Sequence, residues 1–308
     1  MRPTIRRYQG EEDFWRIRAF LREVFLLNGR RELSWHVARL DYWRWHFVEN
    51  CGSCGPLEEV TFLWETGDGQ IAAVLHPLFV GEAFLHVHPA YRSQALEDEM
   101  LACAEELLAA SPGDDQCSLS IQVHRDDIQR QRTLALRGYS LYGHPVRHWR
   151  RDLDGPLPEA QAPPGYTIRA MGDAGEFPAR SWASWRAFHP DEPDEDYEGW
   201  EWYRNVQAGP LYRRDLDIVA VTQGGEVAAF STLWYDDVTR SAVCVLVGTV
   251  PEHQRRGLGR AVVLEGLRRL QRMGGTRALA NGYDPPANAL YDAVLGTAEL
   301  SDCWLKRW

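Results

Sequence analysis

The chain has 308 residues, a formal net charge of −10, and the apolar and charged fractions of an ordinary soluble protein. This length is sufficient for two domains of average size. The acidic excess argues against a nucleic-acid-binding protein, because contacts to phosphates need a surplus of Lys and Arg. No window approaches the ~20 apolar residues of a membrane-spanning helix, and Met1–Gly10 lacks the apolar core of a secretory signal. We therefore expect a cytoplasmic protein without nucleic-acid or membrane partners.

Six cysteines are scattered along the chain, which is typical of free thiols in a reducing compartment. Cys51 and Cys54 form a C-x-x-C pattern in a glycine-rich stretch. A zinc site would need two more ligands, for which His86 and His88, on one face of an expected strand, are candidates. A lone C-x-x-C pattern in a loop is weak evidence, so we predict no metal site.

The first half of the chain contains one clear strand-to-helix segment. The apolar run Ala83–His88 predicts a strand, and after a short turn a helical stretch continues to Ala110. Residues 152–165 contain four prolines and little apolar content, so neither a helix nor a strand is expected to run through them. We therefore predict a first domain over residues 1–151, a linker over 152–165, and a second domain over 166–308.

The second half is expected to alternate strands and helices after an opening hairpin, which is typical of an α/β fold with a mixed sheet. Apolar periodicity and turn residues place these elements along the chain. The expected strands are Tyr166–Ala170, Asp217–Val221, Glu226–Tyr235, Ala242–Val250 and Arg277–Ala280. The expected helices are Gly175–Phe188, Gly199–Val206, Leu258–Met273 and Pro286–Leu295, and the tail to Trp308 can add strands.

The two halves repeat the same order of elements. A shift of 162 residues aligns Pro89 with Pro251 and Leu96 with Leu258. Further along, a shift of 158 residues aligns Gly138 with the glycine that follows Leu295. The similarity is weak residue by residue, but the order of elements is consistent, so we predict an internal duplication.

The turn between the fourth expected strand and the long helix carries the chemical signal. The first turn of a helix leaves backbone N–H groups without partners, and the helix dipole places partial positive charge there. Gly257 and Gly259 would let a diphosphate approach this backbone, and Arg255, Arg256 and Arg260 add positive charge. On the turn alone, a surface loop that needs glycine only for its bend explains the pattern equally well.

The order of the neighbouring elements decides between these interpretations. A strand precedes the turn, an amphipathic helix follows it, and Asn288 and Tyr291 stand at the start of the next helix. This order resembles the GNAT (GCN5-related N-acetyltransferase) superfamily. Its signature R/Q-x-x-G-x-G/A is matched by Gln254, Arg255, Arg256, Gly257, Leu258 and Gly259. Asn288, Tyr291 and the following Leu295–Gly296 match the Asn…Tyr…Gly pattern of the family, so the resemblance covers most of the second half.

The resemblance implies an α/β fold of two tandem GNAT-like domains, each a mixed, mostly antiparallel twisted sheet flanked by helices. The arrangement is similar to that of mycothiol synthase-type proteins. In the first half, however, Glu97 stands at the position of the second glycine and would face the diphosphate. Arg130 and Thr133 stand at the asparagine and tyrosine positions. The first domain is therefore expected to be a degenerate copy that does not bind CoA.

For the second domain, the resemblance implies acetyl-CoA as co-substrate and a primary amine of a small molecule or peptide as acceptor. In such folds the central strand splays from its neighbour, and the pantetheine arm adds to the freed edge, here Leu246–Val250. A backbone N–H on this edge can stabilise the developing oxyanion. The expected CoA contacts are Gly248, Thr249, Val250, Gln254, Arg255, Arg256, Gly257, Leu258, Gly259, Arg260 and Asn288.

The resemblance also implies which residue donates a proton in the reaction, but not which residue accepts one. A phenol with a pKa near ~10 can protonate the leaving thiolate, whose pKa is near ~8.5, and Tyr291 matches the family position for this acid. A tyrosine that only packs on the sheet is the alternative. The base stays open, because the strand Ser241–Val250 contains no carboxylate. The candidates are Asp236, Asp237, His189, Asp284, a water chain and the carboxylate of Trp308.

Seven carboxylates lie between Asp191 and Glu201, interleaved with Tyr197, Trp200 and Trp202. In GNAT folds this region borders the acceptor site, so it either binds a cationic acceptor or is a solvated loop before an amphipathic helix. Two other functions stay open: a protein N-acetyltransferase, and a non-catalytic acyl-CoA-binding or scaffold protein. The sequence does not determine the acceptor, the acyl length or the oligomeric state.

Overall fold

The computed structural model describes residues 2–111 and 116–308, which divide into two compact units. Unit 1 comprises Met1–Arg147 and Glu299–Trp308, and unit 2 comprises His148–Ala298. In the described ranges, no helix has both the length and the apolar character needed to cross a lipid bilayer.

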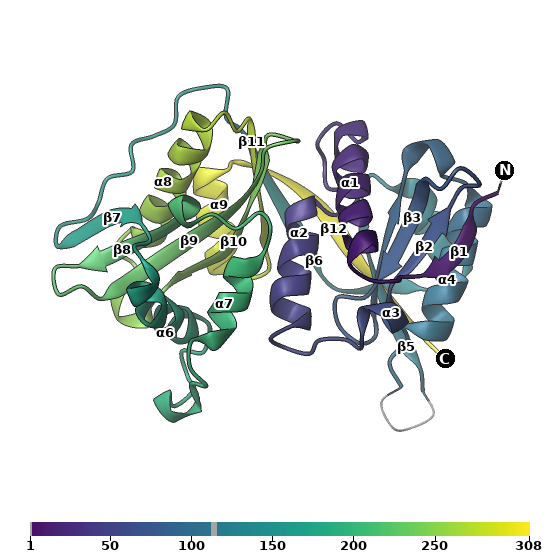
Figure 1. Cartoon of the computed structure of the whole chain (residues 1–308), viewed down its shortest axis with the longest axis horizontal. Helices are drawn as coiled ribbons and strands as arrows, with labels where there is room; N and C mark the ends of the chain where they lie inside the picture. Colours follow the sequence, from purple (N-terminus) through teal and green to yellow (C-terminus); the bar gives the residue numbers. More distant parts are fainter. Residues whose placement is uncertain (1, 112–115) are drawn as a thin grey trace. The chain divides into compact units, whose positions relative to one another are not determined.

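Unit 1 follows the order of strands and helices that the repeat predicted (Figure 1). Its strands are β1 (Thr4–Arg7), β2 (Phe62–Glu65), β3 (Ile71–His76), β4 (Glu82–Val87), β5 (Ser118–His124), the first part of β6 (Ser140–Asp152) and nearly all of β12 (Thr297–Arg307). Its helices are α1 (Glu11–Leu27), α2 (Val37–Tyr42), the π-helix Trp43–Val48, α3 (Leu57–Val60), the short 3₁₀ helix Pro89–Tyr91, α4 (Gln94–Leu107) and α5 (Ile128–Leu136).

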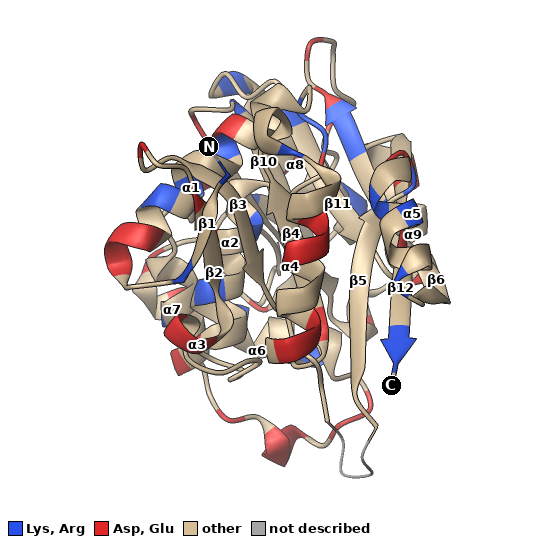
Figure 2. Cartoon of the chain, turned by 90° about the vertical axis from the view of Figure 1, so that its right-hand side faces the viewer, with Lys and Arg blue, Asp and Glu red and all other residues tan. Residues whose placement is uncertain are grey.

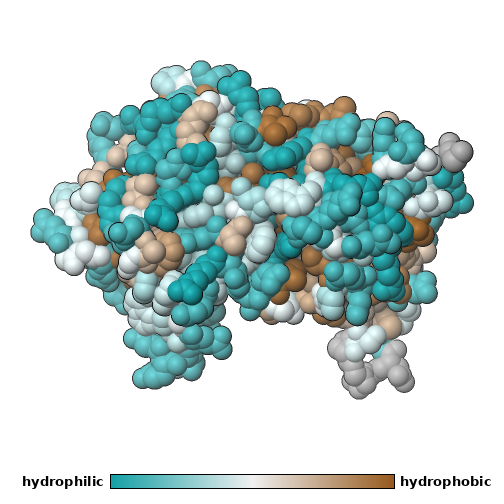
Figure 3. Space-filling view, viewed as in Figure 1, coloured by the Kyte–Doolittle hydropathy of each residue, from teal (hydrophilic) through white to brown (hydrophobic). Residues whose placement is uncertain are grey.

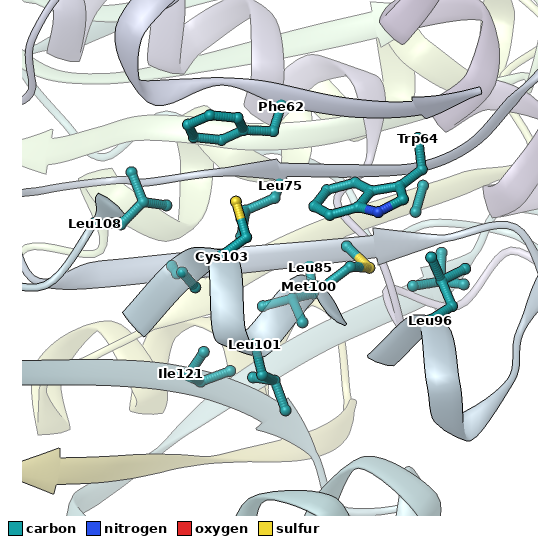
Figure 4. Packing of buried hydrophobic residues seen from close by; sticks show 14 of the residues in the cluster. Phe62, Trp64, Leu75, Leu85, Leu96, Met100, Leu101, Cys103, Leu108 and Ile121 are labelled. Atoms are coloured by element: carbon teal, nitrogen blue, oxygen red, sulfur yellow. The ribbon is translucent and has the colours of Figure 1, made fainter. Parts of the chain in front are cut away.

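The sheet of unit 1 is antiparallel except for one pair. Strands β1 to β4 pair antiparallel in sequence order, β4 pairs parallel with β5, and β5 pairs antiparallel with β12. The apolar face of α4 packs on this sheet. Figure 4 shows Met100, Leu101 and Cys103 of α4 lying against Leu85 of β4 and Ile121 of β5. Burial of apolar side chains on both sides of this contact holds the helix on the sheet.

The last strand, β12, follows unit 2 in sequence but pairs with a strand of unit 1. We predicted a second domain that extends to residue 308, whereas β12 pairs with β5 of unit 1 from Ser301↔His124 to Arg307↔Ser118. Ion pairs support this register, including Arg125 to Asp302 at 2.8 Å. Strand pairing depends on backbone hydrogen bonds that any side chain permits, so the sequence of the tail alone does not reveal its partner.

Unit 2 contains every strand and helix predicted for the second half, with ends shifted by one or two residues. Its strands are β7 (Tyr166–Ala170), β8 (Asp217–Thr222), β9 (Val227–Asp236), β10 (Ser241–Thr249) and β11 (Arg277–Gly282). Its helices are α6 (Phe177–Phe188), α7 (Glu201–Ala208), α8 (Leu258–Arg272) and α9 (Pro285–Val294). The short 3₁₀ helices are Ala174–Glu176, Asp194–Asp196, Arg214–Leu216 and Pro251–His253.

The sheet of unit 2 repeats the pairing of unit 1. Strands β7 to β10 pair antiparallel in order, and β10 pairs parallel with β11. Helices cover both faces (Figure 1). Gly266 of α8 lies against Leu233 on one face, whereas Phe230 lies against Ala187 of α6 on the other. The mixed, mostly antiparallel sheet flanked by helices is confirmed.

The proline-rich segment 152–165 lacks helices and strands beyond the end of β6, as predicted, but it is not a free tether. Gln271 of α8 donates to the carbonyls of Leu153 and Gly155, both at 2.8 Å. Leu157 and Ala160 pack against the core of unit 2. The linker therefore runs along the surface of the second unit and helps to cover α8.

Unit 1 contains a fully buried pair of histidines. The Nε2 atoms of His76 and His86 are 2.9 Å apart. His76 Nδ1 lies 2.9 Å from the carbonyl of Pro77 and donates to it, while His86 Nδ1 accepts the Trp35 N–H. The two rings are therefore neutral and share one hydrogen bond. Burial lowers the pKa of His76 to about 4. Burial also lowers the pKa of His86, together with the repulsion that a protonated His76 and the charge of Arg130 would exert on a protonated His86.

We predict that the free energy of unfolding decreases as the pH falls from about 6.5 toward about 4. The unfolded chain binds a proton at His76 in this range and the folded chain does not. This shift should make the protein about 2 kcal/mol less stable at pH 5 than at pH 7. Urea unfolding at both pH values measures the difference. In His76→Gln, which cannot be protonated, the decrease should be smaller by that amount, and equal decreases would contradict the assignment.

Candidate active site

The floor of the candidate site is β10, which changes direction in its middle. The register with β9 shifts between Val245 and Val247, and Leu246 has φ 60°. A leucine in this left-handed conformation is strained, and such strain is retained where the surrounding structure requires it. The parallel pairing with β11 ends at Cys244↔Ala280. The bulge and the end of pairing together leave the second half of β10 without a partner strand on the β11 side.

This open edge presents only part of the backbone that we predicted to bind pantetheine. The N–H of Val250 donates to Ala228 of β9 and its carbonyl accepts from His253, so Val250 is not available. Backbone groups alternate sides along a strand, so Gly248 also faces β9, while Val247 and Thr249 face the open edge. The backbone of Val247 and the N–H of Thr249 are therefore placed to bond an extended ligand, whereas the Thr249 carbonyl accepts from Gln254 at 3.2 Å.

Gly248 has a packing role that the sequence did not reveal. The bulge lies at Leu246 and not at Gly248. A Cβ at Gly248 would lie 2.5 Å from the ring of Phe230 and 2.9 Å from Ala187. Glycine is required here because α6 and β9 meet against β10, which does not depend on a ligand.

The turn after β10 forms an open cluster of backbone amides. Gly257 has φ 81° and is the N-cap of α8, and Arg255 also has a positive φ of 61°. The first main-chain bond of α8 runs from Ala261 N–H to Gly257 O, so the N–H groups of Leu258, Gly259 and Arg260 project from the helix end. This cluster with its partial positive charge suits a diphosphate.

Gly259 brings this helix end close to the open edge. A Cβ at Gly259 would lie 3.4 Å from Thr249 Oγ1 and 3.6 Å from Leu290 of α9. Both are ordinary contacts, so the packing alone would accept an alanine. The free amides of α8, the open edge of β10 and α9 therefore meet at one place, which is the geometry that an extended diphosphate ligand needs.

The polar side chains of the turn divide into two groups. Gln254 donates to the carbonyl of Thr249 at 3.2 Å, and Arg256 donates to Tyr166 at 2.9 Å and to the carbonyl of Glu252. These two residues hold the turn in shape. Arg255 and Arg260 are exposed and extend the positive charge at the helix end.

The start of α9 adjoins the gap between β10 and β11. Asn288 Oδ1 accepts from Trp149 at 3.4 Å, and it could not occupy this position if Gly282 of β11 had a side chain. Tyr291 is buried in a cluster that includes Cys244 of β10 and Ala280 of β11, the last residues that pair. Tyr291 thus belongs to a buried core that β10 and β11 share, and this position also serves the packing of α9.

Comparison with known proteins identifies this arrangement. Residues 178–297 match the model of the acetyltransferase (GNAT) family. The second unit is a GNAT domain. The match supports acyl transfer as the general chemistry of the domain. No curated protein matches the sequence.

Solved structures extend the fold likeness of the GNAT domain to the whole chain. A GCN5-related N-acetyltransferase from Sphaerobacter thermophilus has a TM-score of 0.66 at 17% identity, covering 99% of this chain and 95% of its own. A tandem GNAT protein from the clavulanic acid biosynthesis pathway has a TM-score of 0.67 at 16% identity, covering 99% and 98%. A GNAT-family acetyltransferase from Colwellia psychrerythraea has a TM-score of 0.61 at 12% identity, covering 98% and 100%. These likenesses show that the chain has the fold of two GNAT-like domains in tandem.

Unit 1 keeps the gap of the GNAT domain but fills it with its own side chains. The parallel pairing of β4 with β5 stops at Ala83↔Ile121. In the part of β4 beyond this point, the carbonyl of Leu85 accepts from Arg130 Nη1 at 2.9 Å. Leu85 aligns with Val247 at the shift of 162, so Arg130 binds where the open edge of β10 would bind a ligand.

The charge of Arg130 is balanced by the residue that replaces the second glycine. Glu97 is fully buried and accepts from Arg130 Nε at 2.8 Å and Nη2 at 2.9 Å. Arg92, at the Gln254 position, bonds both Glu97 and Asp127. The start of α4 is acidic where that of α8 is not (Figure 2). Glu97 and Arg130, which depart from the family pattern, thus form one ion-pair cluster with Arg92 and Asp127.

Two of the base candidates have structural roles in the GNAT domain. Asp236 accepts from the N–H and the hydroxyl of Thr239, at 3.0 and 2.7 Å, and so closes the β9–β10 hairpin. Asp284 caps α9 by accepting from Ala287 N–H at 2.7 Å. Both carboxylates are therefore engaged in local turns. The Trp308 carboxylate belongs to unit 1, where the Trp308 backbone pairs with Cys117.

The remaining candidates differ in position. Asp237 is exposed in the β9–β10 hairpin, at the end of β10 opposite the turn. His189 follows α6 directly, and the nearby Ala187 packs against Gly248. His189 Nδ1 lies 3.0 Å from Glu192, and its ring packs edge-on against Trp185 at 4.5 Å. An imidazole oriented by a carboxylate is a common form of general base, which favours His189.

The acidic segment between α6 and α7 is anchored by its aromatic residues. Tyr197 and Trp202 both donate to the buried Ser181 Oγ at 2.8 Å. Its carboxylates face solvent, and the segment forms a hydrophilic projection (Figure 3). Arg186 of α6 pairs with both Asp194 and Glu252, at 3.4 and 2.8 Å, and so connects this segment to the turn before α8.

The possible zinc ligands do not come together. His86 is engaged with His76, and His88 caps the following helical turn by accepting from Ala90 N–H at 3.1 Å. In residues 2–111 and 116–308, no group of three or more His, Cys, Asp or Glu side chains could hold a metal ion.

We predict that removing one partner of the Glu97–Arg130 pair destabilises the protein strongly. Glu97→Met leaves the buried Arg130 guanidinium with only the longer pair to Asp127 at 3.9 Å, which costs about 3–5 kcal/mol. The double variant Glu97→Met/Arg130→Met should recover most of this loss, because no unpaired charge stays buried. Urea unfolding of the two single variants and the double variant measures the coupling. Additive effects of the two substitutions would contradict the assignment.

Proposed function

We propose that the protein transfers an acetyl group from acetyl-CoA to a primary amine, and that only the GNAT domain of unit 2 binds CoA. The observation that carries the proposal is the meeting of free helix amides with an unpaired strand edge at Gly259 and Thr249. The amides of α8 bind the diphosphate, and the pantetheine arm adds to the backbone of Val247 and Thr249 as an extra strand.

In the reaction, the amine nitrogen attacks the thioester carbonyl, a C–N bond forms and the C–S bond breaks. A backbone N–H at the open edge of β10 stabilises the oxyanion. Tyr291 gives its phenolic proton to the leaving thiolate, and His189 accepts the proton that the amine loses. The products are the N-acetylated amine and free CoA, and a proton passes from His189 through solvent to restore Tyr291.

Two observations support this assignment over a non-catalytic acyl-CoA-binding protein. Tyr291 shares a buried core with Cys244 and Ala280, the last residues that pair, and His189 lies at the end of α6 that packs on β10. An acid and a base on opposite faces of the same strand are needed for transfer and not for binding. A missing carboxylate on β10 is therefore no obstacle, because His189 supplies the base from α6.

We predict that Gly259→Glu lowers the affinity for acetyl-CoA at least tenfold. The new carboxylate repels the diphosphate, yet it suits the first turn of a helix, so the fold should be retained. Isothermal titration calorimetry measures the affinity and should give one site per wild-type chain. Arg272→Gln changes the net charge equally at the far end of α8 and should bind as the wild type does. Unchanged affinity in Gly259→Glu, or a second site in the wild type, would contradict the proposal.

We predict that Tyr291→Phe lowers kcat by about 10²–10⁴-fold, because the thiolate must then leave without a positioned acid. The affinity for acetyl-CoA should not change, since the ring is retained. Thiol release with a panel of primary amines measures the rate, and calorimetry measures the affinity. A full rate in the variant would show that Tyr291 serves packing alone.

A further inference from the structure

The acceptor reaches the thioester from the face of the sheet that CoA does not use. This step rests on the proposed function, in which the diphosphate lies at the start of α8. Helix α8 packs on Leu233 of β9, whereas Phe230 of the same strand faces α6. The acceptor therefore approaches the bulge at Leu246 between β10 and the layer formed by α6 and α7.

A buried polar cluster lies in this layer. Asp217, at the start of β8, accepts from Tyr203, from Tyr212 at 3.0 Å and from Thr232 at 3.0 Å. Arg180 of α6 pairs with Asp217 at 3.3 Å through Nε and donates to Thr232 at 3.2 Å through Nη2. Burial raises the pKa of both tyrosines, so they stay neutral. The cluster therefore holds one positive and one negative charge.

One nitrogen of this cluster has no partner. Arg180 is fully buried, and its Nη1 makes no hydrogen bond with the part of the chain that the structure describes. A buried N–H without an acceptor is costly, so such groups normally have a partner in the working protein. The unpaired edge of this guanidinium is the strongest sign of a ligand on the acceptor side.

Arg180 is close to the open half of β10. Its guanidinium lies 3.7 Å above the centre of the Phe230 ring, and this ring fills the space beside Gly248. Thr232, which Arg180 also bonds, is the partner of Val245 at the start of the bulge. The guanidinium therefore lies one side chain, Phe230, away from the strand where the thioester would react.

The charges around Arg180 favour a neutral acceptor atom. The charge of Arg180 is already balanced by Asp217, so a carboxylate would leave a net negative charge in a buried site. The exposed carboxylates between α6 and α7, including Asp194 and Glu195, also repel an anionic acceptor. A carbonyl oxygen satisfies Nη1 without adding charge.

We propose that Arg180 Nη1 donates to an amide carbonyl of the acceptor, so that the acceptor class is amines with a neighbouring amide, as in amino-acid amides and peptide N-termini. The carbonyl fixes the amine in front of the thioester. Free amino acids and simple alkyl amines lack the neutral carbonyl and are poorer acceptors.

The test compares L-alaninamide with isopropylamine, in which a methyl group replaces the carboxamide, and with L-alanine. The ratio of kcat/KM for alaninamide to that for isopropylamine is measured in the wild type and in Arg180→Lys. Comparing the same ratio in both proteins cancels the different pKa values of the amines. Lysine keeps the charge opposite Asp217 but lacks the second edge of the guanidinium. The ratio should fall about 10- to 100-fold in the variant, the range expected for a hydrogen bond to a charged donor.

Two further variants separate recognition from stability. Arg18→Lys alters a buried arginine of unit 1 whose Nε and Nη2 both bond Asp41, and should leave the ratio unchanged. Arg180→Met/Asp217→Asn removes both charges together and should lower the ratio even if Arg180→Lys folds poorly. An unchanged ratio in both Arg180 variants, or a wild type that prefers free alanine to alaninamide, would overturn the inference. Absence of acetyl-CoA binding would instead overturn the proposed function, and this assignment with it.

Discussion

The structure of the second unit depends on the point where β10 and β11 stop pairing. A parallel pair normally continues until one strand ends, but here it ends at Cys244↔Ala280 while β10 continues to Thr249. The bulge at Leu246 turns the remaining backbone away from its neighbour. An unpaired edge inside a sheet leaves hydrogen-bonding groups without partners, and such groups need a ligand or a side chain.

The two units solve this problem in different ways. In unit 1, Arg130 bonds the unpaired carbonyl of Leu85, and Glu97 balances its charge. In unit 2, Gly259 and Asn288 stand at the corresponding positions. The unpaired strand edge is thus bonded by a side chain of the same unit in unit 1, and it is a candidate binding site in unit 2. The substitutions at these two positions account for the difference, because the buried charges of unit 1 are stable only as a complete cluster.

Most strands and helices of unit 2 could be predicted, because apolar periodicity, proline and glycine mark them locally. The turn at Gly257 and Gly259 could be predicted for the same reason, and so could the replacement of a glycine by Glu97. The roles of individual residues could not. Gly248 serves packing against Phe230, Val250 is engaged with β9, and Asp236 and Asp284 close local turns. The roles of Gly248 and Val250 depend on neighbours that are distant in sequence, whereas Asp236 and Asp284 bond residues only three positions further along the chain.

By itself, the sequence determined the order of elements, the duplication and the glycine-lined start of α8, since these depend on residues within one helical turn or one strand. Only the tertiary structure decided that β12 completes the sheet of unit 1, that Arg130 and Glu97 meet, and that Arg180 is buried with an unpaired nitrogen. Backbone hydrogen bonds pair almost any two strands, and a charge becomes costly or useful only when burial removes water from it. Strand pairing and side-chain burial are properties of the folded chain, so the amino-acid sequence alone did not predict them.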